Sequence, residues 1–301
     1  MSAINEVKEQ ISVVRSVGDF TSALQQIAAM RMMTLRRQVL ASKRFVDEST
    51  EILRELKLHR ELIYKEEYEK ANKRAFKKKS EEQKKDKEAL IIITSNAGLC
   101  GTYNGEIFKQ LEGYILNNNA GADIFIAGKK GQEHYLTNKK YKFKFYPYSI
   151  PDNFTAHDLL RLIGVFAHYD KILMVYSRYV NTMERDVVET MLITPPVSPQ
   201  DINPENPKAV AFQEEQKVKY LFEPSIEELI LDVSSKLRAA SFQQQIFDSR
   251  LSQYAAQMVG MQMASDNAKV MLEDLNHGYN KERRKLIDKK IGEVFAGSAL
   301  W

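Results

Sequence analysis

Residues 247–279 read FDSRLSQYAAQMVGMQMASDNAKVMLEDLNHGY and carry the clearest periodicity in the chain. Apolar or small residues recur there at alternating steps of four and three positions. The series is Phe247, Leu251, Tyr254, Met258, Met261, Ser265, Ala268, Leu272, Leu275 and Tyr279. This spacing is the heptad seam of a coiled coil, which buries itself against another helix. Because Ser265 and Ala268 are small, the partner helix is expected to approach closely there.

The heptad stretch belongs to a longer predicted helix that begins just after Pro224. Ser225 is placed to act as the N-cap, and Glu228 follows at the spacing of a capping box. No proline occurs between Ser225 and the end of the sequence. A single C-terminal helix is therefore predicted over residues 224–301.

The partner of this helix is predicted at the other end of the chain, in residues 1–63. That region contains no proline, and Gly18 is its only glycine. Apolar residues are spaced three or four positions apart, which predicts one apolar stripe on a helix roughly 80–90 Å long. The stripe comprises Ile4, Val7, Ile11, Val14, Val17, Phe20, Leu24 and Ile27. Two long terminal helices imply an antiparallel hairpin with a domain inserted between them.

The inserted region, residues 89–223, has the pattern of an α/β domain. Short apolar runs at 89–95, 123–127 and 171–177 predict buried strands, with weaker strand candidates at 141–146 and 218–222. Helical segments are predicted between them, at 105–116, 130–137 and 156–167. Alternating strands and helices favour a largely parallel, Rossmann-like sheet. Residues 194–208, rich in proline and asparagine, are predicted to form a surface loop.

Residues 64–88, between the first helix and this domain, are dominated by lysine and glutamate. They are interpreted as a solvated helix extension or a linker, and a charged contact surface for a partner is the alternative. The predicted fold is thus an antiparallel coiled coil of residues 1–63 and 224–301, with an α/β domain inserted at 89–223.

The composition excludes several classes of protein. The 301 residues are 44% apolar and 28% charged, enough for a packed core. The net charge of +4 comes from 44 basic and 40 acidic residues, a balance that does not indicate a nucleic-acid-binding protein. Cys100 is the only cysteine, so no internal disulfide can form. The start lacks a signal-peptide pattern, and no apolar run approaches the ~20 residues that span a bilayer. We expect a protein that is cytosolic or peripheral to a membrane.

Catalytic motifs are sparse. Gly98, Leu99, Cys100 and Gly101 lie between a predicted strand and a predicted helix, a place where phosphate-binding turns occur. They lack the Gly-Lys-Ser/Thr of a P-loop and the glycine spacing of a dinucleotide site, so a structural turn is the preferred interpretation. The five histidines are scattered without metal-ligand spacing. No catalytic, cofactor-binding or metal-binding residue is predicted.

Several segments, in order along the chain, resemble the gamma subunit of F-type ATP synthases. TSNAGLCGTYN at 94–104 is similar to the family's Asp-Arg-Gly-Leu-Cys-Gly segment, and YSRYVNTM at 176–183 to the end of its mid-domain strand. FEP at 222–224 is similar to the entry of its last helix. The most specific match lies in the tail, in ASDNA at 264–268, YNKERR at 279–284 and GSAL at 297–300.

The resemblance implies a function and a set of partners. The helical hairpin would turn inside a ring of alpha and beta ATPase subunits, and the α/β domain would contact an epsilon-type subunit and the membrane c-ring. The chain would be a non-catalytic rotor shaft, with ATP bound only by its partners and with no cofactor of its own. It would lie peripherally on the cytoplasmic face of the inner membrane, or its organellar equivalent, and touch the membrane only through partner subunits.

The sequence also departs from the family at positions that would face the ring. Leu24 and Gln25 replace a Met-Lys pair, Gln257 stands where an Arg is expected, and Arg283-Arg284 replaces an Arg-Gln pair. These five residues are the candidate ring contacts. The same departures leave open a specialised ATPase that only hydrolyses ATP and does not translocate protons. A ligand-binding α/β domain on a dimerising coiled-coil stalk is the alternative from another class, and it requires the C-terminal helix to pair with a second copy of itself.

Deletion of residues 1–20 is expected to expose the seam around Leu272 and Tyr279, because that seam would lose its partner. The truncated chain should aggregate or lose helix, as measured by light scattering and circular dichroism. A truncated chain that stayed monomeric and equally helical would contradict the intramolecular hairpin.

Overall fold

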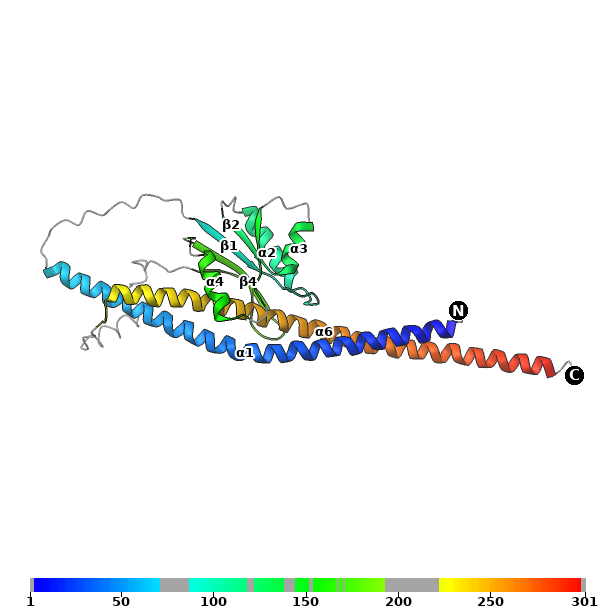
Figure 1. The fold of residues 1–301 in the computed structure, drawn as a ribbon. Coiled ribbons are helices and arrows are strands. Elements are labelled where there is room, and N and C mark those ends of the chain that lie inside the picture. Colours follow the sequence, from blue (N-terminus) through cyan, green and yellow to red (C-terminus); the bar gives the residue numbers. More distant parts are fainter. Residues whose placement is uncertain are drawn as a thin grey trace.

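A computed structural model describes residues 3–70, 87–117, 122–137, 144–151, 154–166, 168–169, 171–192 and 222–298. Two long helices, α1 (Ala3–Lys70) and α6 (Ile226–Ser298), run antiparallel and pack along each other to form a rod. At about 1.5 Å per residue each is on the order of 100 Å long. Figure 1 shows both ends of the chain at the same end of the rod and the α/β domain beside the first half of α6.

The heptad seam predicted in the C-terminal helix is confirmed. Phe247, Leu251, Tyr254, Met261, Ser265 and Ala268 are buried, and Met258, Leu272, Leu275 and Tyr279 are half-buried. The helix begins as predicted, because the Ser225 hydroxyl accepts a hydrogen bond from the Glu228 backbone N–H at 3.2 Å. Its partner is α1 of the same chain, which contradicts a stalk formed by self-pairing of the C-terminal helix.

The predicted stripe on the N-terminal helix is only partly right. Val17, Phe20 and Ile27 are 49%, 60% and 48% exposed, so they lie outside the seam. Two successive steps of three, from position 14 to 17 to 20, turn the stripe about 120° away from the partner helix. The seam instead continues in heptad steps through small residues. Its buried members on α1 are Thr21, Ala28, Val39 and Leu53, and Gly18 lies against Ala268.

Other boundaries differ from the predicted ones by a few residues. Helix α1 extends to Lys70, seven residues beyond the predicted end, so the first part of the charged segment 64–88 is helical. The rest of that segment lies outside the described residues as far as residue 86. Residues 194–208 and 218–221 also lie outside them, so neither the predicted loop nor the predicted strand at 218–222 is tested.

The inserted domain contains a five-stranded sheet in the order β3-β2-β1-β4-β5. Its strands are β1 (Glu88–Ile93), β2 (Asp123–Ala127), β3 (Phe145–Tyr148), β4 (Lys171–Tyr179) and β5 (Arg185–Met191). The first four are parallel, as predicted, and β5 pairs antiparallel with β4. The sequence pattern did not predict β5 and placed β3 too early, because both are edge strands in which no residue is fully buried.

Helices cover both faces of the sheet. One face packs on α2 (Tyr103–Asn117) and α3 (Lys129–Thr137) through a cluster that includes Leu90, Ile92 and Ile107. The other packs on α4 (Ala156–Phe166) and on α6, whose Phe242 and Ile246 belong to the same cluster as Ile91 and Met174. This stretch of α6 therefore contributes side chains to two cores, that of the rod and that of the domain.

No helix within the described part of the chain is both long and apolar enough to cross a membrane.

Gly18 tests the close approach of the two long helices. A Cβ atom built on it would lie 3.4 Å from the Cβ of Ala268, which is ordinary contact. Gly18→Ala should therefore raise the free energy of unfolding, by up to about 1 kcal/mol, since alanine has the higher helix propensity. Gly18→Leu should lower it by about 1–3 kcal/mol, because the larger side chain must push the helices apart. Urea denaturation followed by circular dichroism measures both, and a Leu variant as stable as the Ala variant would contradict this packing.

Candidate functional site

An apolar stripe runs along the exposed side of α1, roughly a quarter-turn from the seam. Val13, Val17, Phe20 and Ile27 are between 48% and 60% exposed, and the half-buried Leu24 lies in line with them. Val13, Val17 and Phe20 also line a shallow groove together with two serines of the same helix. Contiguous exposed apolar residues of this kind mark a surface that a partner covers.

The far end of α6 is a second exposed surface. Gly18 lies opposite Ala268, so the antiparallel register brings Ala3 level with Arg283. Residues beyond this point extend past the end of α1, as Figure 1 shows. This protruding segment combines basic residues with exposed apolar ones, namely Leu286, Ile287, Ile291, Val294 and Phe295.

The candidate ring contacts fall into two groups. Arg283 and Arg284 are exposed and lie where α6 outruns α1. Leu24, Gln25 and Gln257 are half-buried along the paired part of the rod. The Gln25 amide donates a hydrogen bond to the Gln262 side chain on α6, so this residue also joins the two helices.

One side of the turn Gly98–Gly101 lies against α6, and Gly98, Leu99 and Gly101 remain exposed on the other side. Leu99 and Gly101 have positive φ values of 64° and 55°. A Cβ atom on Gly260 would lie 3.8 Å from the Leu99 carbonyl oxygen and the Gly101 nitrogen. The Cys100 side chain is buried, and burial raises the pKa of its thiol although hydrogen bonds with Ser95 and Gln253 act in the opposite direction. A buried thiol with a raised pKa is a poor nucleophile.

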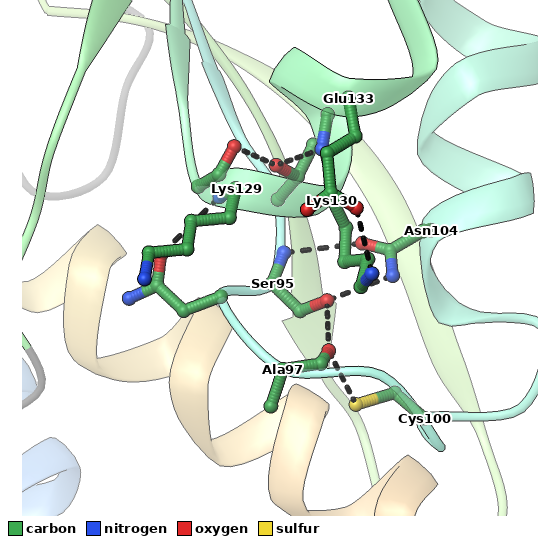
Figure 2. Close-up of polar contacts among 11 residues, drawn as sticks. Ser95, Ala97, Cys100, Asn104, Lys129, Lys130 and Glu133 are labelled. Carbon is green, nitrogen blue, oxygen red and sulfur yellow. Dashed lines mark hydrogen bonds and ion pairs between the residues drawn. The ribbon is translucent and has the colours of Figure 1, made fainter.

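Hydrogen bonds fix this turn to the start of α2 and α3, as Figure 2 shows. The Asn104 side chain accepts from the Ser95 N–H at 3.1 Å and donates to the Ser95 hydroxyl at 2.8 Å. The Ser95 hydroxyl donates to the Ala97 carbonyl at 2.7 Å, and the Ser95 carbonyl accepts from the Lys130 N–H at 3.0 Å. Because these polar groups bond to one another, they are not free to bind a phosphate group.

Ligands of open α/β sheets bind outside the carboxyl ends of the strands where the strand order reverses, here between β1 and β4. In this chain α6 crosses that position. The Ser252 hydroxyl of α6 lies there, 2.7 Å from that of Ser177 on β4. Beside it, at the ends of β1 and β2, a cavity of only about 20 Å³ remains, and its lining includes Thr94, Asn96, Gly128, Ser249, Arg250 and Gln253. That volume suits roughly one water molecule, whereas small-molecule sites occupy about 300 Å³ or more. The crevice that would hold a nucleotide is filled by the rod. Nor do three or more His, Cys, Asp or Glu residues gather to hold a metal ion within the described ranges.

Asp248 lies where α1, α6 and the hairpin between β4 and β5 come together. Its carboxylate accepts the backbone N–H of Tyr179 at 3.3 Å, and the residue is 9% exposed. Burial raises the pKa of Asp248 to about 6, against the lowering effects of the Tyr179 hydrogen bond and the positive charges of Arg178 and Lys43. The sequence pattern did not indicate this buried carboxylate, because an acidic residue between heptad positions is usually exposed.

These features define a class of protein: a helical stalk with exposed partner surfaces, carrying a small α/β domain whose ligand crevice is closed. A family model for ATP synthase matches residues 3–300. The chain therefore belongs to the ATP synthase gamma-chain family. It is 26% identical to the ATP synthase gamma chain of Chloroflexus aurantiacus, covering 99% of both chains, and 26% identical to that of Flavobacterium johnsoniae, covering 99% of this chain and 98% of the relative.

Solved structures share the fold. A chain of the Euglena gracilis mitochondrial ATP synthase (OSCP/F1/c-ring) matches with a TM-score of 0.62 and 16% identity, covering 98% of this chain and 93% of its own length. A chain of the central stalk and c-ring of the Tetrahymena thermophila mitochondrial ATP synthase matches with a TM-score of 0.55 and 20% identity, covering 82% and 99%.

Asp248→Asn should change how stability depends on pH. The raised pKa means that the stabilising contribution of protonated Asp248 is fully present below about pH 4 and lost as the pH rises through about 6. The amide stays neutral and can still accept the Tyr179 N–H. We therefore expect the stability of the variant relative to the wild type to rise by about 1–2 kcal/mol between pH 4 and pH 7. Denaturant titrations across this range test it, and parallel pH curves for the two proteins would contradict it.

Proposed function

We propose that this chain is the central rotor shaft of a rotary F-type ATP synthase or ATPase. The observation that carries the proposal is the family match over residues 3–300, on a chain folded as one rod with a docked α/β domain. The shaft would turn inside a ring of alpha and beta subunits, and its α/β domain would meet an epsilon-type subunit and the membrane c-ring. The Euglena structure, which contains F1 and a c-ring, supports this set of partners.

The geometry suits a part that transmits rotation. A packed pair of helices resists bending and twisting better than a single helix, and it has different side chains on every face. An off-axis shaft of this kind would press on successive ring subunits as it turns, and so couple rotation to their conformational changes. The ATP would bind to those subunits, since the crevice of the α/β domain in this chain is filled by α6.

The exposed surfaces of the rod supply the contacts with the ring. The apolar stripe around Val17, Phe20 and Leu24 would slide against apolar side chains lining the ring. Arg283 and Arg284 would face acidic groups, because the protruding end of α6 is rich in lysine and arginine. Gln25 and Gln257 would make weaker, uncharged contacts further along the paired helices.

Location follows from the partners. The chain would be a peripheral component that reaches the membrane only through other subunits. We place it on the cytoplasmic face of the inner membrane, or on the equivalent face in an organelle. The departures at positions 24, 25 and 257 remove charges that would face the ring. They fit a ring with compensating changes, and they fit equally a hydrolytic motor without proton coupling, which is the second candidate.

Recovery of the tagged chain from its native membranes, with the co-purifying chains identified by mass spectrometry, tests the proposal. Alpha, beta, epsilon-type and c subunits are the expected partners. Alpha- and beta-like chains without a c-ring would favour the hydrolytic motor, and recovery without any ATPase subunit would overturn the rotor function.

The same recovery with Val17→Glu and Phe20→Glu combined tests the apolar stripe. Both side chains are exposed, so the isolated variant should stay as helical as the wild type while recovering several-fold less alpha and beta subunit. Gln26→Glu, an exposed position of the same helix, is the matched control and should recover normal amounts. Equal recovery by variant and control would remove the stripe from the ring contact.

A further inference from the structure

The segment of α6 from Gln245 to Ala256 is buried on almost every side although much of it is polar. Asp248, Ser249, Arg250 and Ser252 are 9%, 0%, 8% and 1% exposed. A helix that is buried all round is ordinarily apolar all round, because an unpaired polar group in a protein interior costs free energy. These four polar side chains therefore require partners, and the partners come from the inserted domain.

These four polar side chains bond to three parts of the domain: α2, β4 and the residues after β3. The Ser249 hydroxyl is 2.8 Å from the hydroxyl of Tyr103, the first residue of α2. The Ser252 hydroxyl is 2.7 Å from that of Ser177 on β4. The guanidinium of Arg250 donates to the carbonyl of Pro151, which follows β3.

Asp248 completes the set, since its carboxylate accepts the Tyr179 N–H at the end of β4. Tyr179 in turn packs against the cluster formed by Val39 of α1 with Phe247 and Leu251 of α6. The domain is thus bonded to one helix of the rod and also packed against the other.

Hydrogen bonds matter here because they are directional. Apolar helix faces can slide past their neighbours by small shear movements at little cost. Short hydroxyl contacts inside a buried interface lose most of their energy when displaced by an ångström, and a broken one leaves a buried polar group unpaired. Several such contacts, aimed at the loops and strands around one stretch of helix, fix the domain against both sliding along α6 and turning around it.

We propose that this joint, made by Tyr103, Ser177 and Tyr179 of the domain with Asp248, Ser249 and Ser252 of α6, is the coupling through which turning force passes between the α/β domain and the shaft. The inference rests on the proposed rotor function, in which the two parts meet different partners. Turning force that arises at the helices would then reach the membrane ring only while the hydrogen bonds of this joint stay intact. The six residues are positioning residues and touch no substrate.

The test compares ATP-driven proton uptake with ATP hydrolysis in inverted membrane vesicles whose complex contains Tyr103→Phe with Ser252→Ala. Both changes remove one hydroxyl each and keep the apolar shape. Hydrolysis should stay near the wild-type rate, whereas proton uptake per ATP hydrolysed should fall by roughly thirtyfold, as for the loss of two buried hydrogen bonds.

Tyr169→Phe with Ser235→Ala is the matched control. It removes the same atoms, but Tyr169 bonds to Asp123 inside the domain and Ser235 to Asp232 within α6, both away from the joint. Its ratio of proton uptake to hydrolysis should equal that of the wild type. The amount of this chain retained on the vesicles, measured by immunoblot, must match among all variants.

A covalent replacement of the joint separates force coupling from a general loss of structure. Because the Ser177 and Ser252 oxygens are 2.7 Å apart, cysteines at both positions would lie within reach of a disulfide. With Tyr103→Phe, Ser177→Cys and Ser252→Cys combined, the reduced complex should be uncoupled. Oxidation by copper phenanthroline should restore the ratio of proton uptake to hydrolysis, and reduction of the disulfide by dithiothreitol should lower this ratio again.

An unchanged ratio in the joint variant, or no recovery on oxidation, would overturn the inference while leaving the rotor function intact. Wild-type vesicles that hydrolyse ATP without any proton uptake would instead overturn the proton-coupled function on which the inference rests.

Discussion

The pairing of α1 with α6 is the constraint on which the rest of the structure depends. The two helices lie close because small residues, Gly18 and Ala268, face each other where large ones would hold them apart. That close pairing makes one rod out of the two ends of the chain. It also leaves the buried polar segment of α6 from Asp248 to Ser252 beside the inserted domain, which supplies its hydrogen-bond partners. The α/β domain is therefore held in place by hydrogen bonds with the polar side chains of α6 as much as by its own apolar core.

The filled crevice follows from the same arrangement. A sheet of this strand order usually keeps the ends of β1 and β4 free for a ligand. Here α6 crosses that edge, with Ser252 bonded to Ser177 of β4. The polar groups of the turn, which could otherwise orient a phosphate, bond instead to Asn104 near the start of α2. An α/β domain of a kind that often binds nucleotides here binds the long helix α6 instead. Function in this chain lies in surfaces and joints rather than in a pocket.

Sequence patterns predicted most of the fold and much less of the site. Heptad spacing from Phe247 to Tyr279 and the apolar strand runs specify burial strongly, because each misplaced residue would cost apolar contact. The seam of α1 was harder to predict, since it passes through Gly18, Thr21 and Ala28 while larger apolar residues such as Phe20 point outward. The joint on α6 could not be predicted. Its serines and aspartate are typical of exposed helix faces, and only the docked domain makes them buried.

The hairpin topology also has a consequence for how the chain is made. Residues near Ile4 pair with residues near Glu282. Helix α1 is synthesised first, and it cannot pair until α6, the last helix, has been synthesised. At about 5–20 residues per second that interval is on the order of tens of seconds. Throughout it, the seam of α1 and its outer apolar stripe are both uncovered, on a helix too long to hide them. The nascent chain therefore passes through a stage in which α1, with its exposed apolar surfaces, is complete but has no partner helix. The seam of α1 is then covered only when α6 is complete, and the outer stripe only when a partner binds it.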